Sequence, residues 1–141
     1  MRISSLLSAL SSRLVEAGVI TMDNDFAGEN MPPLRVDQTE FWIHENYLGH
    51  GIAPLNTKRR RIMDVMVQYD LYVPLGGGTM RLDEKTEQIE RLFDPNVPEN
   101  SDINGEDFTA KIIRLQVDED MTVGDWCMRP VLIYISVASH A

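Results

Sequence analysis

The sequence predicts an α+β domain in which two helices pack on one face of a mainly antiparallel sheet. Two segments carry apolar residues at helical spacing, and several others alternate apolar and polar residues as strands do. They follow one another in the order helix, strands, helix, strands, which is typical of α+β domains. At 141 residues the chain is expected to form a single domain, 1–141.

The first predicted element is a helix over residues 2–17. Apolar residues recur at the spacing of one helical face, and they are Ile3, Leu6, Leu7, Leu10 and Leu14. Serines and Arg13 make the opposite side polar. Gly18 is expected to end the helix, because glycine adopts the left-handed conformation of helix ends at little cost.

Two short strands and two loops are predicted before the clearest strand of the chain. A short strand is expected at 19–22, followed by a loop over 23–33 that is rich in Asp, Asn, Gly and Pro. A second strand is centred on 39–47. The long polar connection LGHGIAPLNTKRRR then covers residues 48–61.

The clearest strand covers residues 62–73. Its odd positions are apolar or aromatic, namely Met63, Val65, Val67, Tyr69, Leu71 and Val73. Its even positions include Asp64, Gln68 and Asp70. Alternation over this length predicts that the odd face packs on the core and, in an α+β domain, on both helices. Pro74 and the glycines at 76–78 are expected to end the strand.

A second helix is predicted between Thr79 and Pro95. The Thr79 hydroxyl is expected to cap it, since threonine accepts hydrogen bonds from free backbone N–H groups at helix starts. Its buried side is expected to consist of Leu82, Ile89, Leu92 and Phe93. The acidic segment that follows, 94–108, is predicted to be a flexible loop from its content of Pro, Asn, Asp and Gly.

The last two strands are predicted to form a hairpin. Residues 108–117 would place Ile113, Leu115 and Val117 on one face, and residues 126–137 would place Val131, Ile133, Ile135 and Val137 on one face. The final strand is the most hydrophobic, so we expect it inside the sheet. Pro130 predicts a strand start, an edge or a bulge, because proline lacks the N–H that a central strand uses.

The composition excludes several classes of protein. A net charge of −9 is unlike a general nucleic-acid binder, whose affinity comes from basic groups. The single cysteine, Cys127, allows no internal disulfide and no zinc site built on paired cysteines. The N-terminal residues lack the apolar core of a signal peptide, and no apolar run is long enough to span a membrane. We therefore expect a soluble protein made in the cytoplasm.

No catalytic or cofactor motif emerges from the sequence. His44, His50 and His140 do not have metal-ligand spacing, and the glycines at 76–78 lack the lysine of a phosphate-binding loop. The acidic residues at 23–25 and 118–120 lack the pattern of a calcium loop. Two alternatives stay open: a small enzyme that uses His50 with Asp118 or Asp120, and a module that binds a small ligand or peptide.

The order of elements resembles a family of phage proteins. The pieces that carry the resemblance are, in order, ISSLLSALSSRLVEAG, PPLRVDQTEFWIHENY, RRRIMDVMVQYDLYVPLGGGT, EQIERLF and GDWCMRPVLIYIS. Together they are similar to the tail terminator-like proteins of long-tailed (siphovirus-type) bacteriophages, over nearly the whole chain. The long acidic loop 94–108 departs from the family pattern.

The resemblance implies a structural virion protein and not an enzyme, with no cofactor. Such a protein forms a homo-oligomeric, hexameric ring at the head-proximal end of the tail. The ring caps the tail tube, stops its polymerisation and presents a surface to the head-completion or connector protein. The genomic DNA only passes through the lumen, no membrane is involved, and the ring assembles in the host cytoplasm. Another position in the head–tail joint is the alternative within this class.

If the chain forms a ring, two groups of residues have expected roles. The basic cluster Lys58, Arg59, Arg60 and Arg61 is the candidate interface, because arginine grips carboxylates on a neighbouring acidic subunit or on the tube. Asp64 and Asp70, or the acidic loops, are candidates for the lumen, where negative charge would keep DNA from sticking. A sheet edge near the end of the chain is a further candidate for pairing with, or packing on, a neighbouring subunit.

Overall fold

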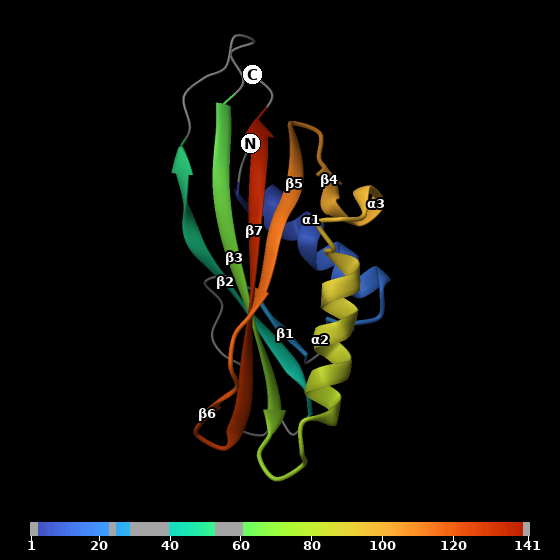
Figure 1. The fold of residues 1–141 in the computed structure, drawn as a ribbon, viewed down its shortest axis with the longest axis vertical. Coiled ribbons are helices and arrows are strands. Elements are labelled where there is room, and N and C mark those ends of the chain that lie inside the picture. Colours follow the sequence, from blue (N-terminus) through green and yellow to red (C-terminus); the bar gives the residue numbers. More distant parts are fainter. Residues whose placement is uncertain (1–2, 23–24, 29–39, 53–60, 140–141) are drawn as a thin grey trace.

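A strongly twisted sheet of seven strands dominates the molecule (Figure 1). The computed structural model describes residues 3–22, 25–28, 40–52 and 61–139, with residues 50–52 and 61 described for their backbone only. The strand order is β1-β2-β3-β7-β5-β4, and β6 also pairs with β7. The strands are β1 (Phe26–Ala27), β2 (Trp42–Ile52), β3 (Arg61–Pro74), β4 (Asp102–Asn104), β5 (Phe108–Val117), β6 (Met121–Val123) and β7 (Trp126–Ser139). All pairings are antiparallel except that of β1 with β2.

Three helices accompany the sheet in the described part of the chain: α1 (Ile3–Glu16), α2 (Met80–Leu92) and α3 (Pro98–Ser101). Figure 1 shows α1 crossing behind β5 and α2 running beside the sheet. The four leucines of α1 and the residues Leu82, Ile89 and Phe93 are buried in one cluster with the odd residues of β3. None of these helices is long and apolar enough to cross a membrane.

The predicted alternation of the longest strand is confirmed. All six odd residues from Met63 to Val73 are buried in β3, and so are Val131, Ile133, Ile135 and Val137 of β7. β7 lies between β3 and β5, as its hydrophobicity predicts. The sheet edge expected near the end of the chain is not on β7, because β7 is paired along both sides.

Pro130 is buried in the centre of the sheet, at a gap in one ladder. Asp118 donates its backbone N–H to the Pro130 carbonyl at 3.0 Å, where β5 has just ended and β6 has not yet begun. In a strand the N and O of one residue point to the same side. The missing N–H of Pro130 thus faces the interruption between β5 and β6, so no ladder bond is lost there.

The predicted face of β5 is wrong for Ile113, whereas Leu115 and Val117 share the core side, opposite Ile133 and Val131. In β5 the buried residues are Phe108, Ala110 and Ile112, while Ile113 is 56% exposed. The register against β7 shifts between Ile112 and Arg114, so Ile113 is the extra residue of a β-bulge. The bulge reverses the alternation, and half-buried Leu115 continues the core side.

Three local predictions differ from the structure. Residues 19–22 do not form a strand, and the short strand lies at Phe26–Ala27 instead. The Asp25 carboxylate accepts the N–H groups of Thr21 at 2.7 Å and Met22 at 2.9 Å. Thr79 precedes α2, but its hydroxyl makes no capping bond. The loop 94–108 contains α3 and β4, because Ile103 is buried and pairs with Ala110.

Candidate functional site: an assembly surface

The sheet has a second face, formed by the even residues of β3 and β7. At one end of this face Trp42 of β2 stacks on Tyr72, with ring centroids 4.1 Å apart, and Trp126 meets both rings edge-on. Trp42 is buried and its indole N–H has no partner among the described residues. Three aromatic rings therefore close this end of the second face.

The other end of the second face is hollowed into a groove of about 640 Å³. Its walls include Leu48, Asp64, Met66, Ile113, Arg114 and Tyr134. The Arg114 guanidinium lies over the Tyr134 ring at 4.1 Å from the centroid, a cation–π arrangement. The groove is open, mainly apolar and bordered by one arginine and one aspartate. These features make the groove a candidate contact surface.

The predicted lumen residues differ in their surroundings. Asp64 is exposed and lines the groove. Asp70 is only 7% exposed, and its carboxylate accepts hydrogen bonds from Asn46 Nδ2 at 2.9 Å and Gln68 Nε2 at 2.6 Å. Burial raises the pKa of Asp70, although Gln68, His44 and Asn46 act in the opposite direction. Of these two residues, only Asp64 presents its carboxylate to solvent, and its place in a lumen stays a prediction.

The basic cluster lies at the start of β3. Lys58, Arg59 and Arg60 are outside the described residues. Arg61 opens β3, where its backbone pairs with Ser139 near the end of β7. The candidate interface role of this cluster stays a prediction.

Sequence reasoning missed a buried polar pair on the core side. The Tyr69 hydroxyl donates to Glu45 Oε2 at 3.0 Å, and both side chains are buried. The pKa of Tyr69 is raised well above its ordinary value by burial and by the Glu45 charge. The only signal was the position of Glu45, between Ile43 and Tyr47 in an alternating strand. We read the pair as a core contact between β2 and β3, since the strands place these two residues opposite each other.

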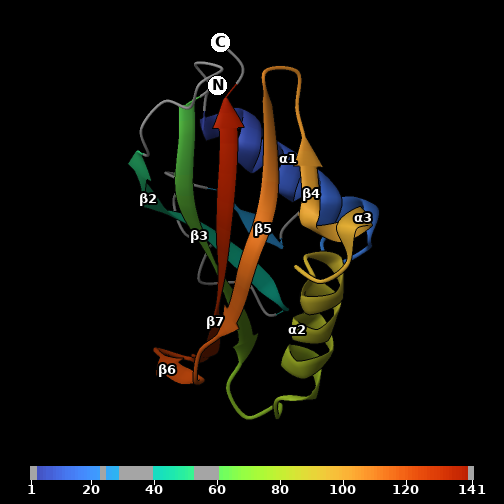
Figure 2. The ribbon, with the colours of Figure 1, turned by 45° about the horizontal axis from the view of Figure 1, so that its top comes forward.

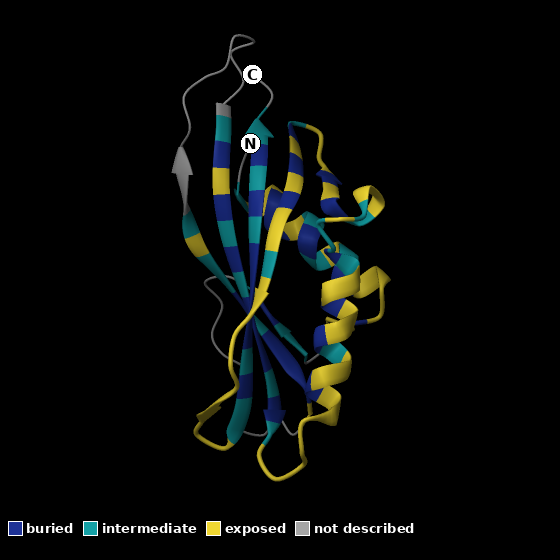
Figure 3. Ribbon diagram, viewed as in Figure 1, coloured by how far each residue is buried: buried dark blue, intermediate teal, exposed yellow. Residues whose placement is uncertain are grey.

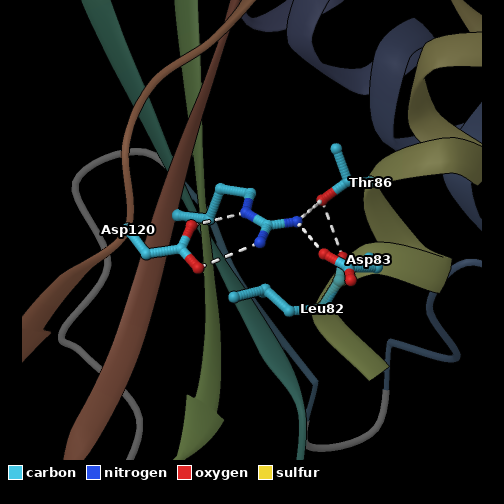
Figure 4. A network of polar contacts seen from close by, with 5 residues as sticks. Leu82, Asp83, Thr86 and Asp120 are labelled. Carbon is cyan, nitrogen blue, oxygen red and sulfur yellow. Dashed lines mark hydrogen bonds and ion pairs between the residues drawn. The ribbon is translucent and has the colours of Figure 1, made fainter. Parts of the chain in front are cut away.

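Arg129 is the centre of a polar network that the sequence did not reveal (Figure 4). Its Nε and Nη2 donate to the two oxygens of Asp120 at 2.5 and 2.9 Å. Its Nη1 donates to Asp83 at 2.7 Å and to the Thr86 hydroxyl at 3.2 Å. The hydrogen bond to Asp120 raises the pKa of Arg129, and the one to Asp83 adds to it. The network joins β7 to α2 and to the segment before β6.

Replacing Arg129 with methionine is expected to lower the free energy of unfolding by about 2 kcal/mol. Hydrogen bonds to charged groups are worth about 1.5–3 kcal/mol, and the partly exposed carboxylates reduce that value. The matched control is Arg91→Met, which breaks only the exposed Arg91–Glu87 pair at 3.6 Å within α2. Chemical denaturation monitored by circular dichroism measures both variants. Equal stability of the two would contradict a role for the network.

The structure brings no catalytic set together within the described residues. Asp120 is bound by Arg129, and Asp118 accepts the Gln116 amide at 2.7 Å. The His50 side chain lies outside the described residues, although its backbone is in β2. No group of three or more His, Cys, Asp and Glu side chains in the described part is placed to hold a metal ion. Gly76 and Gly78 have positive φ angles of 91° and 78°, so the glycines serve the turn between β3 and α2.

Comparisons with known proteins give a likeness of fold. No protein-family model matches the chain, and no curated protein matches it. One solved structure, which carries no descriptive name, aligns with a TM-score of 0.71 and 14% identity over 97% of this chain and 96% of the other. A chain of the virion of a native gene transfer agent particle aligns with a TM-score of 0.52 and 11% identity, also over 97% and 96%. The fold is thus shared with a virion protein.

Proposed function

We propose that this chain is a structural virion protein of a phage-like particle, a tail terminator that forms a hexameric ring on the end of the tail tube. The observation that carries the proposal is the likeness of nearly the whole chain to a chain of a gene transfer agent virion. The order of sequence motifs supports the finer assignment to the head-proximal end of the tail. The alternative, another head–tail joining protein, is supported by the likeness to the virion chain but not by the order of sequence motifs.

The architecture suits such a role. In this proposal α1 and α2 cover one face of the sheet. The second face, with its groove, contacts neighbouring subunits of the ring. The tube protein and the head-completion protein bind the two ends of the ring. We expect DNA to pass through without binding, because a net charge of −9 opposes the attraction to phosphates that basic groups supply.

The proposal is tested by the mass of the assembly and by its position. Native mass spectrometry and electron microscopy are carried out on the protein alone and on the protein mixed with purified tail tubes. Closed rings on one end of the tubes, with tubes that no longer grow, are expected. A monomer that leaves tube growth unchanged would reject the proposal and favour the ligand-binding or His50-dependent alternatives.

Replacing Arg59, Arg60 and Arg61 together with glutamate is expected to weaken ring assembly or tail capping. Single exposed ion pairs contribute at most about 1 kcal/mol, but contacts repeated around a ring act together. Assembly is measured at low and high salt, since salt screens exposed pairs. The control replaces the same three residues with lysine and keeps the charge. Intact rings and tails of normal length in the glutamate variant would contradict the interface role and indicate that the cluster is part of a solvated loop.

A further inference from the structure

Two of the apolar residues that line the groove on the second face lie at β-bulges. The register between β2 and β3 shifts between Tyr47 and His50, and that between β5 and β7 shifts between Ile112 and Arg114. Leu48 and Ile113, at these two shifts, are 45% and 56% exposed and line the same groove. Bulges that turn two large apolar side chains outward at one place mark a surface built for contact.

The groove also carries positive charge that is unused in the single chain. Arg114 forms no ion pair with the described residues; it contacts the Tyr134 ring and donates to Gln116 at 3.3 Å. Lys111, two residues before the bulge, is exposed as well. Asp64 lies across the groove on β3, so the basic side is the one along β5, and that side favours an acidic and partly apolar occupant.

A surface of that kind projects from the other end of the sheet, in the hairpin formed by β6 and the start of β7. Met121 and Val123 are 48% and 40% exposed. Asp118, Glu119 and Asp125 lie in or beside the same hairpin and are exposed. Figures 1 and 2 draw β6 on the side of the sheet away from α2, and Figure 3 shows it as exposed. The hairpin is thus apolar and acidic, where the groove is apolar with Arg114 and Lys111 along its β5 side and Asp64 on its β3 side.

The hairpin is held in shape by the rest of the chain. Arg129 binds both oxygens of Asp120, the residue before β6, and Leu75 donates its N–H to the Asp125 carbonyl at 3.0 Å. Gly124 has a positive φ of 58°, which allows the tight turn. A preorganised segment loses little conformational entropy on binding, so its affinity is higher than that of a free loop.

The hairpin cannot reach the groove of its own chain. It pairs with β7 at Trp126–Met128, whereas the groove lies at Tyr134 and Ile135 of the same strand. Seven residues of one rigid strand separate the two sites by roughly 23 Å, at about 3.3 Å per residue. Only a second copy can bring the two surfaces together.

We propose that the β6 hairpin of one copy docks in the second-face groove of the next copy. Met121 and Val123 pack on Leu48 and Ile113, and the carboxylates around the hairpin approach Arg114 and Lys111. The contact joins two different surfaces, so it is head-to-tail, the kind that closes into rings. This inference rests on the proposed function only for the closure of the ring.

Site-specific cross-linking tests the docking. Val123→Cys and Ile113→Cys are made separately in a Cys127→Ala background, mixed, and treated with a short bifunctional thiol reagent. Linked dimers are expected in the mixture and not in either variant alone, because the contact is head-to-tail. The control replaces Val123→Cys by Val15→Cys, an equally exposed site on α1, and should give no linked dimer.

Native mass spectrometry of the same samples separates the outcomes. Oligomers without cross-links would overturn the docking and leave ring formation standing. Cross-links in each variant alone would overturn it in favour of a two-fold contact. Cross-linked chains that never close into rings would support the docking and reject the ring. A protein that stays monomeric and unlinked at every concentration would reject both.

A charge exchange tests the orientation. Arg114→Glu in the Ile113→Cys partner is expected to lower the yield of linked dimer at least about tenfold, because like charges then face each other across the contact. Glu119→Arg in the Val123→Cys partner is expected to restore part of it. Arg91→Glu on α2 serves as the matched control and should change nothing. An unchanged yield with Arg114→Glu would overturn the proposed orientation.

Discussion

Replacing Val67 with aspartate is expected to unfold the protein or to remove most of its stability. Val67 is fully buried in β3, between Tyr47 of β2 and Ile133 of β7, and it belongs to the cluster that includes α1 and α2. An unpaired charge at such a site costs several kcal/mol, about 3–5. Domains of this size have only about 5–15 kcal/mol in total.

The measurement is chemical denaturation followed by circular dichroism. Thr109→Asp introduces the same charge at an exposed position of β5 and is expected to change stability by no more than about 0.5 kcal/mol. A soluble Val67→Asp protein that unfolds at the normal denaturant concentration would show that the buried face of β3 is wrongly assigned.

Replacing Gly105 with alanine is expected to lower stability by about 1–3 kcal/mol, the usual cost of overpacking. Gly105 lies in the turn between β4 and β5, and its N–H donates to the Phe108 carbonyl at 2.9 Å. A Cβ there would overlap Cε1 of the Phe108 ring and would stand 2.6 Å from Cδ1 and 2.7 Å from Cζ. Phe108 is fully buried, so its ring has no free space to move into.

The matched control is Gly77→Ala in the turn after β3. A Cβ at Gly77 meets only the Pro74 carbonyl oxygen at 3.8 Å, an ordinary contact, and the backbone there has no positive φ. Stability of this variant is expected to stay the same or rise slightly, because alanine restricts the unfolded chain more than glycine does. If both variants unfold alike, the close packing of Gly105 on Phe108 is not what the structure describes.

The long periodic elements could be predicted from the sequence, and the irregular ones could not. In α1 and β3 every apolar position of the pattern faces the core. The free energy gained by burying a whole apolar face is larger than the contribution of any single residue to the orientation of the element. In β5 the same reasoning placed Ile113 inside, and the bulge turned it outward. A bulge is decided by how a strand fits its neighbour, and β5 must match both the long β7 and the short β4.

The candidate site shows the same division. The basic cluster at 58–61 is visible in the sequence because its residues are consecutive, although its side chains lie outside the described residues. The groove could not be predicted, since its walls come from β2, β3, β5 and β7 and meet only in the folded sheet. Arg129 likewise joins residues that are 9 and 46 positions away in the chain.

Three features could be predicted from the sequence: the helix at the N-terminus, the buried faces of β3 and β7, and the place of the last strand inside the sheet. Each of these predictions rests on the hydrophobic pattern of neighbouring residues and requires no information about distant parts of the chain. The folded chain was needed to find the two bulges, the groove that they border and the contacts of Arg129 and Leu75 that hold the β6 hairpin. Those features depend on register and on contacts between distant segments, and a shift of one residue reverses which side chains face outward.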